Sequence, residues 1–140
     1  MEIPSKKTFL INPLNFDGPC NNKTINVEHD LRPSPTALQI SSSNNVILSG
    51  LTFKDNPHVH VILDYLKSVH VSDITIDNPG DSPYTDGIHI SGSTNVTIDH
   101  CRIATGDDCI SIVKGASYLN ISNITCGPHS HQVTTLGGVR

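Results

Sequence analysis

The feature that most constrains the fold of this chain is a repeated pattern of apolar residues. Four segments carry apolar residues at their first, third, sixth and eighth positions, and they begin at Val46, Val69, Val96 and Leu119. In each segment a pair of alternating apolar residues is followed by a break and a second pair. This spacing is typical of two short strands around a bend, because a helix would repeat its apolar positions every three to four residues.

A further short strand is expected before most of these segments, at a constant offset. Its apolar pairs are Val61 and Leu63, Ile88 and Ile90, and Ile110 and Ile112. Three short strands per unit of 23 to 27 residues are typical of a parallel β-helix, in which each coil pairs with the coils above and below it. An antiparallel sandwich also has alternating strands. The constant register between units favours the β-helix, an all-β solenoid.

The 140 residues are expected to form one partial β-helix domain. Residues 44–140 contain the stacked coils, whereas residues 1–43 carry several Pro and Gly residues and no clear copy of the repeat. Residues 127–140 begin another coil and then stop. Because a solenoid needs a cap over its last apolar layer, the domain is predicted to be truncated.

Composition excludes several classes of function. The net charge is −4 and the nine Lys and Arg residues are scattered, so the chain lacks the basic stripe of a nucleic-acid-binding protein. No apolar run is long enough to span a bilayer, and residues 1–7 lack the apolar core of a signal peptide. We expect a monomer that has no cofactor and no metal.

Two features nevertheless indicate passage through a secretory pathway. Asn-x-Ser/Thr triplets, which accept glycans, occur at Asn22, Asn95, Asn120 and Asn123. The four cysteines have spacings that match no zinc signature, which is compatible with disulfide formation in an oxidising compartment.

Three carboxylates are predicted to meet at one place on the solenoid. Asp86 lies two residues before Ile88 and Asp108 lies two residues before Ile110, so they should stack on adjacent coils with Asp107 beside them. Crowded carboxylates raise the pKa of at least one member, which supplies an acid and a base for glycoside hydrolysis. The alternative is that Asp-Gly and Gly-Asp are turn dipeptides that cap backbone groups or bind calcium.

A histidine is expected to continue this column. The next coil places Val133 where Ile88 and Ile110 stand, and His131 lies two residues before it.

These segments resemble a known family. Thr85-Asp86-Gly87-Ile88-His89-Ile90, Gly106-Asp107-Asp108-Cys109-Ile110-Ser111-Ile112 and Cys126-Gly127-Pro128, followed by histidine, are similar to motifs of the plant polygalacturonases, glycoside hydrolases of family 28. The resemblance extends from about Arg32 to Gly138, with a further match in residues 3–20. It implies a right-handed parallel β-helix, inverting hydrolysis of the α-1,4 bonds of polygalacturonate in pectin, and a secreted enzyme of the cell wall.

The resemblance also implies roles for individual residues. Asp107 matches the general acid that protonates the leaving oxygen, and Asp86 and Asp108 match the pair that activates water. The family's catalytic histidine follows Cys-Gly-Pro. Counting from the aspartates gives Ser130, so His129 or His131 takes that role, and strand register favours His131.

Other residues carry less specific expectations. His60 and His89 match strand positions of the family and are expected to line or buttress the groove as substrate-binding residues. The resemblance implies a disulfide between Cys109 and Cys126. Cys101 falls on an apolar layer and is expected to be a buried thiol, while Cys20 has no evident partner.

The chain departs from the family pattern in three ways. Tyr84 replaces the Asn before Thr-Asp, the sequence ends at Arg140 before the Arg-x-Lys motif that binds the substrate carboxylate, and the early coils with their tryptophans are missing. These departures suggest an incomplete chain. They leave two alternatives open, namely an inactive β-helix fragment that binds pectin or a protein partner, and a calcium-dependent structural solenoid.

Overall fold

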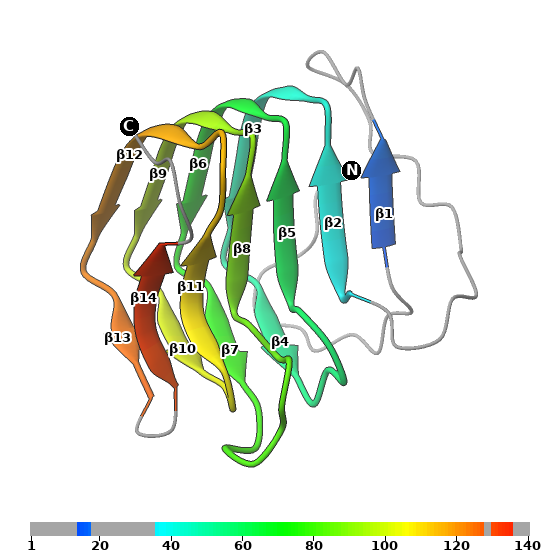
Figure 1. The fold of residues 1–140 in the computed structure, drawn as a ribbon, viewed down its shortest axis with the longest axis vertical. Helices are drawn as coiled ribbons and strands as arrows, with labels where there is room; N and C mark the ends of the chain where they lie inside the picture. Colours follow the sequence, from blue (N-terminus) through cyan, green and yellow to red (C-terminus); the bar gives the residue numbers. More distant parts are fainter. Residues whose placement is uncertain (1–13, 18–35, 128–129, 136–140) are drawn as a thin grey trace.

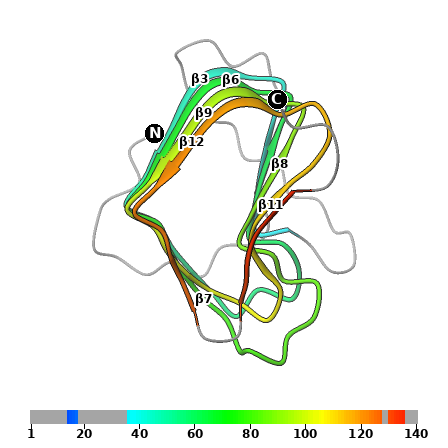
Figure 2. The ribbon, with the colours of Figure 1, turned by 60° about the vertical axis from the view of Figure 1, so that its left-hand side comes forward.

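The computed structural model describes residues 14–17, 36–127 and 130–135, and these residues form a parallel β-helix (Figure 1). Three parallel sheets run along the solenoid, and each complete coil within residues 38–126 contributes one strand to each sheet. Viewed nearly along the solenoid axis in Figure 2, the coils superimpose and enclose an elongated interior. The predicted fold class is therefore confirmed.

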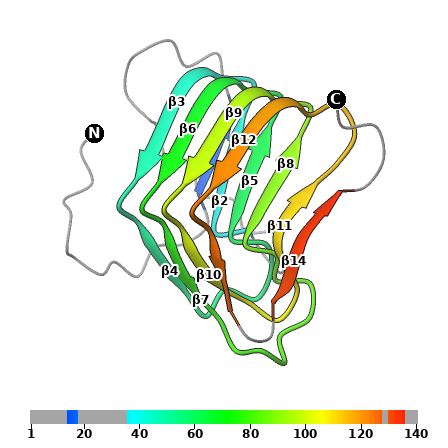
Figure 3. The ribbon, with the colours of Figure 1, turned by 90° about the vertical axis from the view of Figure 1, so that its left-hand side faces the viewer.

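We name the sheets A, B and C. Sheet A has the strand order β1 (Leu14–Asp17), β2 (Leu38–Ser41), β5 (Val61–Asp64), β8 (Ile88–Ser91), β11 (Asp108–Ile112), β14 (His131–Thr135). Sheet B consists of β3 (Asn44–Ser49), β6 (Lys67–Ser72), β9 (Thr94–Asp99) and β12 (Ser117–Ser122), and it faces the viewer in Figure 3. Sheet C consists of β4 (Thr52–Lys54), β7 (Thr75–Asp77), β10 (Arg102–Ala104) and β13 (Thr125–Cys126).

The observed register follows the sequence repeat. In sheet B, Val69 pairs with Val46 and with Val96, and Leu119 pairs with Val96. In sheet A, Ile110 pairs with Ile88. A one-residue slip would turn every apolar side chain outward, so the alternation fixes this register.

Parallel pairing begins earlier than the expected boundary at residue 44. Strands β1 and β2 pair with each other and β2 pairs with β5, so both lie in sheet A. Residues 1–13 and 18–35 lie outside the described part of the chain. Among the described residues, no helix is long and apolar enough to cross a membrane.

The core consists of the inward-facing side chains of the three sheets, stacked coil upon coil. Leu63, Ile90 and Ile112 illustrate one such layer in sheet A, with exposed fractions of 0%, 0% and 3%. Burial of an Ile or Leu side chain contributes about 1.5–3 kcal/mol. Because each side chain contacts its equivalents on neighbouring coils, the core holds consecutive coils in register.

Three of the connections that lead from sheet C to sheet A are described throughout, at the lower corner of the coil in Figure 2. They are residues 55–60, 78–87 and 105–107. The connection 78–87, drawn in green, projects farthest from the coil (Figures 1 and 2). This corner positions the candidate site.

Candidate active site

The structure brings the three predicted aspartates together at the corner between sheets C and A. Asp86 precedes β8, Asp107 ends the turn before β11, and Asp108 begins β11. The Gly87 N–H donates to the Asp108 carbonyl oxygen at 2.9 Å, which stacks the two coils here. One carboxylate oxygen of each aspartate lies within 4.8 Å of those of the other two. All three residues are partly exposed.

Asp86 is held by a serine that the sequence analysis did not single out. Ser111 Oγ donates to Asp86 Oδ2 at 2.6 Å, and His89 Nδ1 lies 2.8 Å from the same hydroxyl and 3.9 Å from Asp86 Oδ2. His89 and Ser111 are register partners in β8 and β11. The alternation of β11 could have identified Ser111, because it points to the same face as His89.

The environment keeps Asp86 ionised. Burial acts to raise the pKa of Asp86, but hydrogen bonding from His89 and Ser111 and the nearby imidazole together lower the pKa below its ordinary value. Asp86 is therefore not the member of the cluster whose pKa crowding raises. An ionised carboxylate is suited to act as a base.

Backbone groups position Asp107. Its Oδ1 accepts from the Asp108 N–H at 3.0 Å, and its Oδ2 accepts from the Tyr84 N–H at 3.1 Å. The Thr105 hydroxyl donates to the Asp107 carbonyl oxygen at 3.0 Å. These bonds fix the carboxylate relative to both the turn and the connection 78–87.

His60 lies beneath Asp86 and has an exposed fraction of 0%, so of the two predicted roles its burial favours buttressing the groove over lining it. Its Nε2 lies 3.1 Å from Asn78 Oδ1 and its Nδ1 lies 3.1 Å from the Asp86 carbonyl oxygen. Burial lowers the pKa of His60, and the hydrogen bonds oppose this only in part. His60 is a buttress for the Asp86 backbone. By contrast, 28% of the His89 side chain is exposed beside the carboxylates, where a ligand can reach it.

Backbone pairing places His131 on the coil next to Asp108, where the sequence predicted a histidine. His131 pairs with Asp108 and Val133 pairs with Ile110, as the strand register predicted. His129 and the side chain of His131 lie outside the described part of the structure. Ser130, the position reached by direct counting, bonds instead to the turn before β11: the Thr105 N–H donates to its Oγ at 2.7 Å.

Cys109 and Cys126 form a disulfide, which confirms the pairing, with 5.7 Å between their Cα atoms. Cys109 follows Asp108 directly, and Cys126 ends β13, so the bond ties the aspartates to the segment that leads to His129 and His131. Cys101 is a buried free thiol, as expected. Cys20 lies outside the described residues.

The three carboxylates are close enough to share one cation. Asp and Glu oxygens suit Ca²⁺ or Mg²⁺. The same spacing suits proton transfer and water activation, and the hydrogen bonds from Ser111 and Tyr84 already occupy an oxygen of Asp86 and of Asp107.

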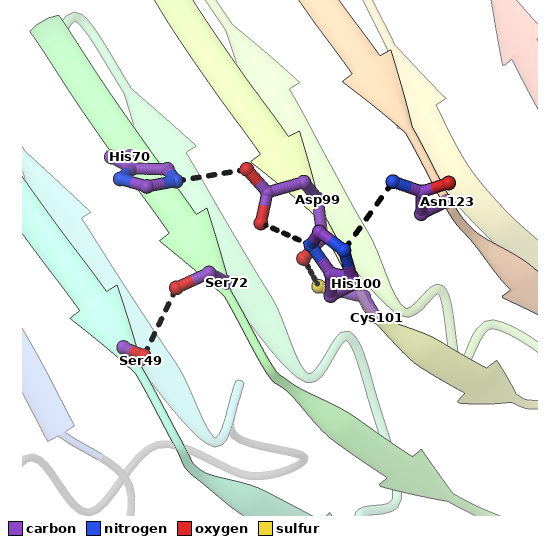
Figure 4. A network of polar contacts seen from close by, with 7 residues as sticks. All are labelled: Ser49, His70, Ser72, Asp99, His100, Cys101 and Asn123. Carbon is purple, nitrogen blue, oxygen red and sulfur yellow. Dashed lines mark hydrogen bonds and ion pairs between the residues drawn. The ribbon is translucent and has the colours of Figure 1, made fainter.

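A second polar cluster lies on the outer face of sheet B, on different elements from the aspartates (Figure 4). Asp99 accepts bonds from His70 Nε2 and His100 Nδ1, each at 3.0 Å, and Asn123 Nδ2 lies 3.4 Å from His100 Nε2. The hydrogen bond to Asp99 raises the pKa of His100. The hydrogen bonds from His100 and His70 lower the pKa of Asp99. The cluster is exposed and links consecutive coils.

Comparison with known proteins agrees with this geometry. The model of "Glycosyl hydrolases family 28" matches residues 12–138. A probable polygalacturonase of Arabidopsis thaliana is 48% identical over 104 residues, which cover 74% of this chain and 23% of that protein. A polygalacturonase of Malus domestica is 42% identical over 105 residues, with the same two coverages. The chain therefore spans about a quarter of the length of these relatives.

Solved structures show the same fold. The polygalacturonase from Erwinia carotovora ssp. carotovora superimposes with a TM-score of 0.69 at 30% identity, over 75% of this chain and 30% of that one. A putative glycosyl hydrolase from Parabacteroides merdae has a TM-score of 0.62 at 18% identity, over 76% of this chain and 45% of that one, and supports the fold alone. With the family model matching nearly the whole chain, this protein belongs to glycosyl hydrolase family 28.

Proposed function

We propose that this chain hydrolyses α-1,4-galacturonosidic bonds in pectin with inversion of the anomeric carbon. The observation that carries the proposal is the meeting of Asp86, Asp107 and Asp108 within 4.8 Å, in a chain of a glycoside hydrolase family. The relatives named polygalacturonase supply the substrate class.

In this proposal the three carboxyl groups divide two tasks between them. Asp107 donates a proton to the leaving glycosidic oxygen, while Asp86 and Asp108 accept a proton from the water that attacks the anomeric carbon. The lowered pKa of Asp86 suits it to this second task. His131, or His129, assists near the leaving group, on the coil that follows Asp108.

The stereochemical part of the proposal depends on the third carboxylate. Inverting enzymes with two carboxyl groups usually separate them by about 6.5–9.5 Å, which leaves room for water. The oxygens here are closer. Inversion therefore requires Asp86 and Asp108 to hold the water jointly on one face of the sugar while Asp107 acts at the other.

The test is release of reducing ends from polygalacturonate by the full 140-residue chain, with circular dichroism to establish folding. Asp107→Asn should lower turnover by about 10²–10⁴-fold, the usual contribution of a general acid. Asp99→Asn removes a carboxylate from the cluster on sheet B and should leave turnover unchanged. Proton NMR of the first-formed product should show the inverted anomer.

Two results would contradict the proposal. A folded chain that binds oligogalacturonate without cleaving it would support a binding module in place of a hydrolase. Retention of the anomeric configuration would contradict the joint role of Asp86 and Asp108.

We further propose that the protein is secreted to the cell wall as a monomeric glycoprotein. Three acceptor residues are exposed on sheet B or in the turn that follows it, namely Asn95, Asn120 and Asn123. N-linked glycans at these residues would not disturb the core. Asn22 lies outside the described residues. A decrease in mass after endoglycosidase treatment of chain expressed in a secretory host tests this proposal, and an unchanged mass contradicts it.

A further inference from the structure

Tyr84 stands beside the candidate proton donor and is exposed to solvent. Its N–H donates to Asp107 Oδ2 at 3.1 Å, so the backbone of Tyr84 contacts that carboxylate directly. Its exposed fraction is 74%. A large aromatic side chain at such a position gains little from folding, because it buries little apolar surface.

The connection that carries Tyr84 is attached firmly to the neighbouring coil. Thr85 Oγ1 donates to the Ser82 carbonyl oxygen at 2.7 Å and accepts from the Gly106 N–H at 3.3 Å. A Cβ at Gly106 would collide with the backbone of Ser82, and its distance from Ser82 N would be only 2.7 Å. Tyr84 is therefore presented from a fixed backbone next to Asp107.

The backbone conformation of Tyr84 is not imposed by the repeat. Tyr84 has φ +61°, in the left-handed region that Asn and Gly tolerate better than Tyr. Tyr65 and Tyr118 also have positive φ, but they occupy positions of the repeat at which a neighbouring coil has positive φ as well, at Gly92 beside Tyr65 and at Asn95 beside Tyr118. Tyr84 lies in the long connection 78–87. Strain held at one point beside an active site points to function.

The chemistry of a bound sugar explains this arrangement. One face of a pyranose ring presents C–H groups, which pack against an aromatic ring, and ligand sites commonly combine aromatic walls with a few polar groups. We infer that Tyr84 is a specificity-determining residue whose ring packs against the galacturonate ring bound next to Asp107. This inference rests on the proposed function.

The test is calorimetric titration of trigalacturonate into the full chain, with Tyr84→Asn, Tyr84→Phe and the control Tyr118→Asn. Tyr84→Asn should weaken binding about threefold to tenfold, the range of aromatic packing. Tyr84→Phe should keep the parent affinity, because the ring remains. Tyr118→Asn changes a tyrosine of similar exposure (80%) and φ (+54°) in β12 of sheet B, and it should leave binding unchanged.

Two further readouts separate this role from a structural or electrostatic one. The melting midpoint of Tyr84→Asn should equal or exceed that of the parent, since Asn relieves the left-handed strain. The ratio of affinities between parent and Tyr84→Asn should not change with salt, because packing on a ring involves no net charge.

The outcomes distinguish the inference from the proposed function. Binding by the parent with equal affinity in Tyr84→Asn overturns the role of Tyr84 and leaves the hydrolase proposal standing, as does an equal loss in Tyr118→Asn. Absence of both binding and turnover in the folded parent overturns the proposed function and, with it, this inference.

Discussion

Removal of the Cys109–Cys126 disulfide should destabilise the protein through the unfolded state. The bond closes a loop with a sequence separation of 17. In the chain-entropy treatment, a loop of this length removes unfolded-state entropy worth about 3 kcal/mol at 25 °C. The double substitution Cys109→Ala/Cys126→Ala should therefore lower the free energy of unfolding by about 3 kcal/mol and the melting midpoint by roughly 10 °C.

The assay is urea unfolding of the full chain, followed by circular dichroism. Cys101→Ala is the matched control, since it removes a buried sulfur without opening a loop. It should cost about 1 kcal/mol. The denaturant slope of the double variant should rise, because its unfolded chain exposes more surface.

A loss of less than about 1 kcal/mol in the double variant would refute the loop-closure reasoning. The same holds if the double variant and Cys101→Ala lose equal stability, because sulfur burial would then account for the whole effect. Turnover that disappears while stability stays high would instead indicate that the bond mainly positions the aspartates and the segment that follows Cys126.

Two further predictions concern the corner between sheets C and A. Gly106→Ala should cost about 2–4 kcal/mol in urea unfolding, because its Cβ would displace Ser82 and break the bonds of Gly106 and Asp107 to the connection 78–87. Gly50→Ala, whose Cβ meets nothing within 4 Å, should cost only the left-handed strain of about 1 kcal/mol. Burial lowers the pKa of His60 in the folded protein below its ordinary value of 6.5. As the pH falls below 6.5, the unfolded state therefore binds a proton at His60 before the folded state does. The free energy of unfolding should decrease from pH 6.5 down to the folded-state pKa. Urea unfolding between pH 8 and 5 should show this loss in the parent and not in His60→Asn; equal slopes would contradict it.

The repeat predicted most of the fold because a solenoid is specified by local alternation. Val46, Val69 and Val96 each mark the same position of a coil, and the structure pairs them in sheet B. The column of Asp86, Asp108 and His131 followed from the same counting. Strands β1 and β2 were missed, since Pro and Gly residues nearby obscured a short pattern; in the structure β1 pairs with β2, and β2 pairs with β5.

The side-chain contacts of the site were less predictable than the stacking of Asp86, Asp108 and His131. Tyr84 reaches Asp107 across coils through a backbone N–H that no spacing distinguishes from others. The alternation of β11 indicates the face of Ser111, but not that its hydroxyl binds Asp86. The burial of His60 likewise depends on Asn78, which supplies an acceptor from a different connection. Such contacts depend on how loops fold back onto the coils.

The one irregular interval of the repeat lies next to the candidate active site. The interval from Val69 to Val96 is longer than its neighbours, and the structure shows why: the connection 78–87 is longer than the connection 55–60 of the previous coil. The extra chain does not extend into solvent alone. It folds onto Gly106, which must lack a side chain to receive it, and it delivers the Tyr84 backbone N–H to Asp107 while the Tyr84 side chain stays exposed. Stacking of regular coils accounts for the column of aspartates, whereas the hydrogen bond from the Tyr84 N–H to Asp107 comes from the inserted chain, which packs against Gly106.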